Sequence, residues 1–261
     1  MGEIETVPAF EVRGLSLSYA AEGGRVTPLH DVSLAIPAGQ FVCIIGPSGG
    51  GKTTLLRCLA GVLEPTEGEI LADGRRVEGP AAERGVVFQQ DAIPMWRRVR
   101  ANIGYGLELR GVDRAERERI VDHYLDAVDL KRFERAWPKQ LSGGQRKRVA
   151  VAATFANDPA SLLMDEPFGS LDYVTRSNLH ELLLRLWRET GKTIVFVTHD
   201  VDEAIKLADR ILVVRDGGIL TDLDVPFARP RSEQLRADAE ANAMRAELLG
   251  MLGHPVAAVA A

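Results

Sequence analysis

The chain has 261 residues, of which 46% are hydrophobic and 26% charged, and this composition is ordinary for a globular protein with a sizeable core. Its formal net charge of −5 argues against a general nucleic-acid-binding protein, which is usually basic. No apolar stretch approaches the roughly 18 residues that a membrane-spanning helix needs, and the acidic first residues do not form a signal peptide. We therefore expect a cytoplasmic protein in which Cys43 and Cys58 are buried as small hydrophobic side chains.

Residues 9–45 have the pattern of β-strands. Residues 9 to about 40 predict an antiparallel opening, in which Val32, Leu34 and Ile36 alternate with small or polar residues as in a half-buried strand. A continuous apolar run at 41–45 predicts a fully buried strand, and helical spacing of leucines begins at Leu55.

The segment between this strand and this helix is rich in glycine, and its sequence is Gly46-Pro47-Ser48-Gly49-Gly50-Gly51-Lys52-Thr53-Thr54. It fits the phosphate-loop pattern G-x-x-x-x-G-K-[ST] in full. The backbone N–H groups of such a loop close on a polyphosphate, and the helix N-terminus adds partial positive charge. We expect Lys52 to reach the β- and γ-phosphates and the Thr53 hydroxyl to ligate Mg²⁺. The alternative, a glycine-rich turn that binds nothing, is disfavoured by the flanking strand and helix.

The middle of the chain changes from strands to helices. Residues 69–75 predict a strand and a tight turn, and a short strand at 86–88 ends before Gln89. From about 91 to 157 the strand patterns vanish, and we expect a helical insertion. One amphipathic helix is predicted at 114–128, with the charged run around its start as its solvated face.

Apolar strands return after the insertion, at 161–164, 193–198 and 211–214. An amphipathic helix at 174–189, ended by Gly191, separates the first two of them, and Asp200 with Glu203 resembles a capping box for the helix that follows the second. The strand at 211–214 is the last one expected, and the tail carries a short helix around 240–252. Buried strands alternating with helices predict an α/β fold with a mainly parallel sheet.

Polar residues that suit phosphate chemistry follow these strands directly. The phosphate loop, Gln89, Asp165-Glu166 and His199 each come after an apolar strand, and ligands bind at the carboxyl ends of parallel strands, so we expect them at one edge of the sheet. Asp165 would present its carboxylate to Mg²⁺, and Glu166 would act as general base toward an attacking water. Two surface acids in a turn are the alternative.

A second glycine-rich helix start occurs at Leu141-Ser142-Gly143-Gly144-Gln145, before a basic run at 146–148. Ser142 with Gln145 fits a capping box. A cap alone is one interpretation, and a second anion site at the helix N-terminus is the other.

These motifs together resemble the ABC-type ATPases, the nucleotide-binding subunits of ATP-binding-cassette transporters. The segment 141–145 resembles the signature motif of that family, and the other motifs occur in the family's order along about residues 10–225. The resemblance implies roles for several matching residues: Tyr19 stacks on adenine, Gln89 links the core to the helical subdomain, Asp165 and Glu166 are the magnesium carboxylate and catalytic glutamate, Asp172 lies in the loop that crosses to a second subunit, and His199 contacts the γ-phosphate.

What the resemblance implies about fold and assembly is specific. The fold is a P-loop NTPase core with an N-terminal antiparallel β subdomain and an inserted α-helical subdomain. The ATPase domain covers 9–225, with the insertion at about 91–157 and a helical tail at 226–261. Two copies sandwich two ATP molecules, and Ser142, Gly143, Gly144 and Gln145 of one copy face the phosphate loop of the other. Gln89 joins Thr53 and Asp165 as a Mg²⁺ ligand, and Lys52, Gln89, Glu166 and His199 serve hydrolysis.

The resemblance also implies partners. A multi-span membrane permease docks near residues 91–111, a soluble substrate-binding protein takes part indirectly, and the subunit lies at the cytoplasmic face of the inner (plasma) membrane. The segments at 102–111 and 168–172 look most like the nitrate, sulfonate and taurine importer branch, although this chain has Pro94-Met95-Trp96 where that branch usually has adjacent Pro and Trp. The alternatives are a cassette of another branch, or a soluble ABC-type ATPase that acts on nucleic acid or the ribosome. A P-loop kinase or GTPase does not explain the motif at 141–145.

Overall fold

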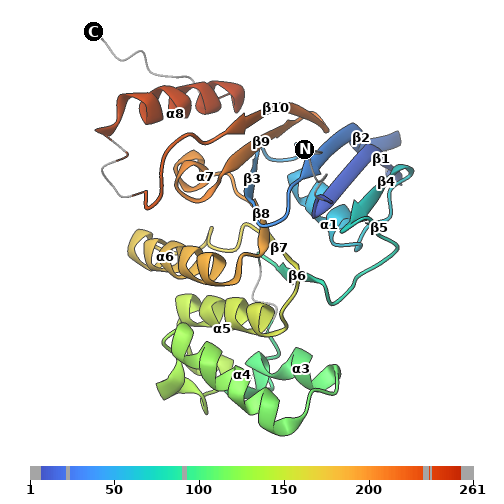
Figure 1. Ribbon diagram of the computed structural model, residues 1–261. Coiled ribbons are helices and arrows are strands. Elements are labelled where there is room, and N and C mark those ends of the chain that lie inside the picture. The colour runs from blue at the N-terminus through green and yellow to red at the C-terminus, as the bar shows by residue number, and fades with distance from the viewer. Residues whose placement is uncertain (1–6, 22–23, 90–92, 232–234, 236, 254–261) are drawn as a thin grey trace, which may run out of the picture. The chain divides into compact units, whose positions relative to one another are not determined.

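The computed structural model describes residues 7–21, 24–89, 93–231, 235 and 237–253, and the chain divides into two compact units (Figure 1). We call Met1–Pro80 with Thr193–Ala261 the core unit, and Ala81–Lys192 the inserted unit. The expected helical insertion at 91–157 falls inside the inserted unit, and its first residue, Asp91, lies outside the described residues.

The core unit begins with an antiparallel sheet in the order β2-β1-β4-β5 (Figure 1). Its strands are β1 (Phe10–Ala21), β2 (Gly24–Ile36), β4 (Glu67–Ala72) and β5 (Arg75–Arg76). Val12 pairs with Leu34 and Leu15 with Val32 in the register of β1 and β2. The antiparallel opening predicted from the sequence is confirmed.

The second sheet of the core unit is mainly parallel. Its strands are β3 (Phe41–Ile45), β8 (Thr193–Val197), β9 (Arg210–Arg215) and β10 (Gly218–Asp224). β3 lies between β8 and β9 and is parallel to both, and every residue of β3 and β8 is buried. The helices of this unit are α1 (Lys52–Leu59), α7 (Val201–Leu207) and α8 (Ala239–Met251). Cys43 in β3 and Cys58 in α1 are buried as expected, and burial raises the pKa of both thiols.

The prediction that 211–214 is the last strand was wrong. β10 follows and pairs antiparallel with β9. No residue of β10 is buried, so its sequence lacks the apolar run that marks the other strands. Arg210 of β9 pairs with Asp222 of β10 instead, with 2.6 Å between Nε and Oδ1. A cross-strand ion pair therefore supports this strand, and only the register reveals it.

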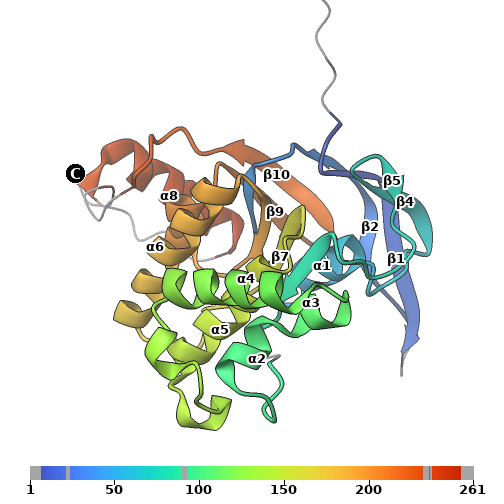
Figure 2. The same cartoon turned by 60° about the horizontal axis from the view of Figure 1, so that its bottom comes forward.

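In the described residues of the inserted unit, β6 (Arg84–Val87) and β7 (Ser161–Asp165) pair in parallel, and the other regular elements are helices. Its helices are α2 (Val99–Ile103), α3 (Tyr105–Leu109), α4 (Arg114–Ala127), α5 (Gly143–Ala156) and α6 (Tyr173–Thr190), with 3₁₀ turns at Lys131–Phe133 and Pro138–Gln140. α5 packs against α2, α4 and α6 (Figure 2). Gly191 ends α6, as predicted, and it does so in the left-handed conformation.

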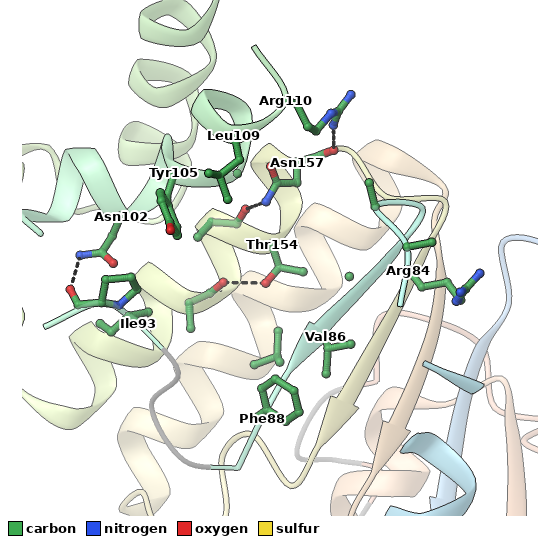
Figure 3. A pocket seen from close by; sticks show the side chains of 18 residues that line it. Arg84, Val86, Phe88, Ile93, Asn102, Tyr105, Leu109, Arg110, Thr154 and Asn157 are labelled. Carbon is green, nitrogen blue, oxygen red and sulfur yellow. Dashed lines mark hydrogen bonds between the residues drawn. The ribbon is translucent and has the colours of Figure 1, made fainter. Parts of the chain in front are cut away.

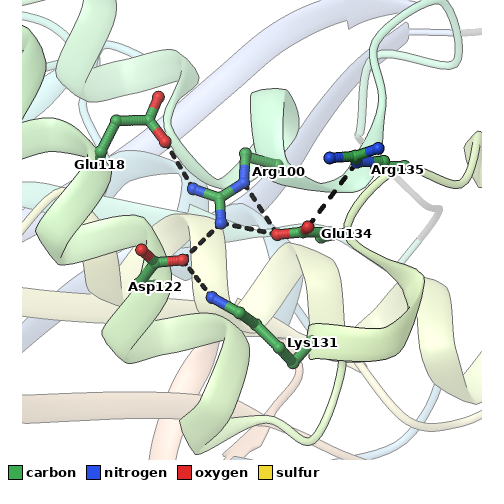
Figure 4. Close-up of polar contacts among 6 residues, drawn as sticks. All are labelled: Arg100, Glu118, Asp122, Lys131, Glu134 and Arg135. Carbon is green, nitrogen blue, oxygen red and sulfur yellow. Dashed lines mark hydrogen bonds and ion pairs between the residues drawn. The ribbon is translucent and has the colours of Figure 1, made fainter.

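The charged run at the start of α4 is more than a solvated face. Glu118 accepts a hydrogen bond from Arg100 of α2 at 2.5 Å, and Arg100 also pairs with Asp122 and Glu134 (Figure 4). Lys131 joins the cluster by pairing with Asp122. One guanidinium thus connects α2, α4 and the segment after α4.

The tail is attached to α7 of the core unit by arginines. Arg231 is buried and donates to the carbonyl oxygens of Ile205 and Phe227 at 2.9 Å each. Burial lowers the pKa of Arg231 to about 10. Arg245 of α8 pairs with Asp202 of α7 at 2.5 Å. In the part of the chain that the structure describes, no helix combines the length and the apolarity needed to cross a bilayer.

Candidate functional site

The phosphate loop leaves β3 and enters α1 in the core unit. A Cβ atom at Gly46 would lie 2.0 Å from the carbonyl oxygen of Val214, so only glycine fits there. Gly51 has a φ of 106° at the N-cap of α1, a conformation that glycine adopts without strain. Lys52 is buried, and its Nζ donates to the carbonyl oxygens of Gly46 at 2.8 Å and Pro47 at 2.9 Å. The lysine amine is thus folded over the loop whose N–H groups are expected to hold phosphate.

His199 and Tyr19 belong to the same unit as this loop. His199 follows β8, which is parallel to β3, so it leaves the sheet at the same end as the phosphate loop. Its side chain is exposed. Tyr19 is about half exposed, with 53% of its surface accessible, and pairs with Val26 across the β1–β2 hairpin. A Cβ at Gly51 would meet Leu29 of that hairpin at 3.0 Å, so β2 passes next to the loop.

Gln89 and Glu166 meet in the inserted unit. They follow the parallel strands β6 and β7, and Gln89 Nε2 donates to Glu166 Oε2 at 3.4 Å. Asp165 is buried as the last residue of β7. Glu166 has a φ of 41°, in the left-handed region that a glutamate rarely adopts. Such strain is concentrated at functional sites.

The second glycine-rich motif forms the start of α5. Ser142 is the N-cap, and its Oγ accepts from the Gln145 N–H at 3.3 Å, while Gln145 Oε1 accepts from the Ser142 N–H at 2.9 Å. The predicted capping box is therefore confirmed, and Gly143 and Gly144 form the first turn of the helix.

Comparisons with known proteins agree on one family. A family model described as ABC transporter matches residues 29–169. The taurine import ATP-binding protein TauB of Roseobacter denitrificans is 46% identical over 220 residues, 83% of this chain and 82% of that protein. The nitrate import ATP-binding protein NrtD of Synechocystis sp. is 44% identical over 217 residues, 82% of either chain. The chain belongs to the ABC transporter family.

A solved structure supports the same fold for this ABC protein. The dimeric structure of a post-hydrolysis state of the ATP-binding cassette MJ0796, bound to ADP and Pi, matches with a TM-score of 0.75 at 31% identity. The match covers 84% of this chain and 100% of that one. The predicted fold class, an α/β ATPase core with an antiparallel β subdomain and an inserted helical subdomain, is confirmed.

Lys147 was not identified as a site residue from the sequence, where it belongs to the basic run at 146–148. Lys147 of the ABC protein is only 3% exposed, and its Nζ donates to the carbonyl oxygen of Gln89 at 2.6 Å. A signal was present, because Gly144, Lys147, Val151 and Phe155 lie at helical spacing on one buried face of α5. Lys147 therefore holds the backbone of the residue whose amide meets Glu166.

Asp172 caps α6 in the inserted unit. Its Oδ1 accepts from the Thr175 N–H at 3.0 Å, and this backbone hydrogen bond lowers the pKa of the Asp172 carboxyl. Tyr173 and Val174 follow it and are exposed apolar side chains at the start of the helix.

A cavity of about 380 Å³ opens in the inserted unit of the ABC protein. Figure 3 shows Phe88, which follows β6, Tyr105 and Leu109 of α3, Thr154 of α5 and Asn157, the C-cap of α5, around it. Residues of the segment 91–111, where the sequence predicts permease docking, form one wall of this cavity, and β6 and α5 supply the others. Leu109 lines the cavity and is 71% exposed, so an apolar side chain of its wall lies open to solvent.

Proposed function

We propose that this protein is the ATP-hydrolysing, nucleotide-binding subunit of an importer for a small anion such as nitrate, a sulfonate or taurine. The observation that carries the proposal is that one chain has both a complete phosphate loop and, in the inserted unit, a hydrogen bond from Gln89 to Glu166 after β6 and β7. The substrate class rests on relatives named as taurine and nitrate import ATP-binding proteins. We assign the ATPase domain to 9–225, with its helical insertion at 91–157, and the tail to 226–261.

In this proposal the phosphate loop, Tyr19 and His199 bind the nucleotide. The backbone of residues 46–54 holds the phosphates of ATP, and Lys52 exchanges its loop carbonyls for the β- and γ-phosphates. Tyr19 stacks on the adenine ring, and the His199 imidazole contacts the γ-phosphate.

Mg²⁺ fits the donors that this chain offers. The Thr53 hydroxyl, the Gln89 amide oxygen and the Asp165 carboxylate are the hard oxygen ligands that Mg²⁺ prefers, and Asp165 is buried as the last residue of β7. When bound, the ion neutralises charge that develops on the phosphates.

Glu166 carries the proton transfer in this mechanism. Its carboxylate accepts a proton from the attacking water as the oxygen bonds to the γ-phosphorus, and ADP leaves as the bond to the β-phosphate oxygen breaks. Gln89 holds the Glu166 carboxylate through its amide. The strained φ of Glu166 is consistent with a side chain fixed for this task.

The glycine-rich start of α5 suggests how two copies of the chain assemble. We infer that Ser142, Gly143, Gly144 and Gln145 of one copy face the phosphate loop of a second copy, with Asp172 and its neighbours at the contact. A dimer is the state of the solved cassette that this chain resembles. The cavity between β6, α3 and α5 receives a short helix of a membrane permease, which places the subunit at the cytoplasmic face of the inner (plasma) membrane. A soluble substrate-binding protein would act on that permease from the other side.

The catalytic assignment is tested with Glu166→Gln, which keeps the size of the side chain and removes its basicity. We expect ATP hydrolysis to fall by about 10²- to 10⁴-fold, the usual contribution of a general base. Binding of ATP should stay within a few-fold of the unsubstituted protein, and light scattering should show a dimer when ATP is present.

The matched control is Glu189→Gln, an exposed glutamate of α6, which should hydrolyse ATP at the original rate. Undiminished hydrolysis in Glu166→Gln would refute the role of Glu166. A monomer at saturating ATP would refute the sandwich.

A further inference from the structure

The backbone on either side of His199 is held by one buried hydroxyl. Thr198 is 2% exposed, and its N–H donates to the carbonyl oxygen of Ile44 in β3 at 3.1 Å. Its Oγ1 accepts a hydrogen bond from the Asp200 N–H at 3.0 Å. The two neighbours of His199 are therefore joined to each other, and Thr198 is joined to the strand that leads into the phosphate loop.

The same hydroxyl also acts as a donor. Thr198 Oγ1 donates to Oε2 of Glu203 in α7, a carboxylate that is only 7% exposed. The Glu203 N–H in turn donates to Asp200 Oδ1 at 3.1 Å. Thr198, Asp200 and Glu203 thus form a closed circuit of three hydrogen bonds. His199 lies between Thr198 and Asp200 in the sequence and is exposed.

Helix capping alone does not account for this circuit. In a capping box the glutamate at the third helical position bonds back to the N-cap N–H. Here the N-cap residue is Asp200, and its N–H donates to the Thr198 hydroxyl instead of to Glu203. The Glu203 carboxylate accepts its hydrogen bond from that same hydroxyl. A hydroxyl satisfies both bonds, because it donates and accepts at one atom.

We propose that Thr198 and Glu203 are positioning residues that fix the His199 imidazole relative to the phosphate loop. The inference rests on the proposed function, in which His199 contacts the γ-phosphate. The circuit limits the backbone of His199, and the Ile44 contact ties it to β3, which ends one residue before Gly46. Contacts to a transferring phosphoryl group depend on such placement.

The test compares Thr198→Val with Thr198→Ser in steady-state ATP hydrolysis. Valine has the shape of threonine without the hydroxyl, and serine keeps the hydroxyl. We expect kcat of Thr198→Val to fall by about 10- to 100-fold, the cost of a misplaced catalytic group, with KM for ATP changed less than about two-fold. Thr198→Ser should restore kcat to within about two-fold of the original. Equal kcat values in the two variants would overturn the proposal.

Two further measurements separate positioning from folding and from the proposed function. Urea unfolding shows how much of any loss reflects the folded fraction, and a loss of kcat that this fraction explains would overturn the proposal. The ¹H–¹⁵N signals of the His199 imidazole need no activity: they should match the original in Thr198→Ser and shift or broaden in Thr198→Val, and unchanged signals would overturn it.

If Thr198→Val does not fold, Glu203→Gln and Glu203→Met make the same comparison. The glutamine amide oxygen still accepts from Thr198, and the methionine thioether is a poor acceptor. We expect Glu203→Gln to keep more of kcat than Glu203→Met, and equal values would overturn the proposal. An original protein that neither binds nor hydrolyses ATP would refute the proposed function, whereas an active protein with an unaffected Thr198→Val refutes only the circuit.

Discussion

Lys147 illustrates how much one buried charge decides at the scale of a residue. Its ammonium group is removed from water, and a buried charge is tolerated only where acceptors surround it. Those acceptors include the carbonyl oxygens of Gln89 and, at 3.5 Å, Phe88. Phe88 lines the cavity of the inserted unit, and Gln89 bonds to Glu166, so Lys147 contacts both a proposed partner site and a proposed catalytic pair.

Replacing this lysine should affect both stability and turnover. Lys147→Met keeps the apolar stem and removes the donor, which leaves the Gln89 carbonyl without its amine. We expect the free energy of unfolding to fall by about 1.5 to 3 kcal/mol, the usual contribution of a hydrogen bond made by a charged group. ATP hydrolysis should fall as well, because Gln89 loses its fixed backbone. Urea unfolding and steady-state hydrolysis measure the two effects.

Lys139→Met is the control for that change, because Lys139 is an exposed lysine of the same unit. Its free energy of unfolding should change by less than about 0.5 kcal/mol. Equal free energies of unfolding for Lys147→Met and Lys139→Met would show that the contact between Lys147 and Gln89 does not stabilise the fold.

Charge also organises the elements of the inserted unit. The Arg100 cluster (Figure 4) joins α2, α4 and the segment around Glu134, which are distant in sequence. Lys131 and Arg100 lower the pKa of Asp122, and Arg100 lowers that of Glu134. The side chains are partly exposed, so solvent screens each pair and the network matters more than any single contact.

The depressed pKa values set the pH dependence of this cluster. The contribution to stability should be complete above the ordinary carboxyl pKa of about 4 and should be lost as the pH falls through the lower values of the folded protein. We expect Arg100→Ala to reduce the free energy of unfolding by about 1 to 2 kcal/mol at pH 7 and by much less near pH 2. Urea unfolding at the two pH values checks this.

Arg114→Ala serves as the matched control, because Arg114 is exposed at the start of α4. It should change stability little at either pH. A difference between Arg100→Ala and the original protein that persists at the acidic pH would contradict the ionic origin of the effect.

The whole molecule is proposed to work as one part of a membrane assembly. Leu109 lines the cavity of the inserted unit and is exposed, and an exposed apolar side chain at the wall of a cavity fits a docking surface. Among the described residues that line the cavity, only Arg84 and Arg110 are charged. We therefore expect an apolar helix to enter between β6, α3 and α5.

Affinity purification from detergent-solubilised native membranes tests this assembly. The tagged protein should recover a single multi-span permease, identified by mass spectrometry, and Leu109→Glu should recover much less, because it places a charge on the cavity wall. Leu220→Glu, on an exposed leucine of β10 outside the cavity lining, should recover as much as the original. Recovery of ribosomal or DNA-associated proteins in place of a permease would contradict the transporter assignment and favour the nucleic-acid alternative.

Much of the site was predictable because its parts obey local rules. The phosphate loop, the Ser142–Gln145 capping box and the end of α6 at Gly191 each depend on a few consecutive residues, so spacing alone identifies them. The strand that precedes His199 was visible as a continuous apolar run. The family resemblance then added the roles that no spacing supplies.

Tertiary structure alone decided which polar groups are buried and what they contact. The charge of Lys147 predicts a surface residue, yet the side chain is buried. β10 has no apolar run that would predict a strand, and the spacing of Glu203 from Asp200 predicts only a helix cap. Each outcome depends on a contact in the folded protein. Lys147 contacts Gln89, β10 pairs with β9, and Glu203 accepts a hydrogen bond from the buried Thr198. Hydrogen bonds within a turn are encoded by neighbouring residues, whereas the burial of a polar side chain is set by elements far away in the sequence.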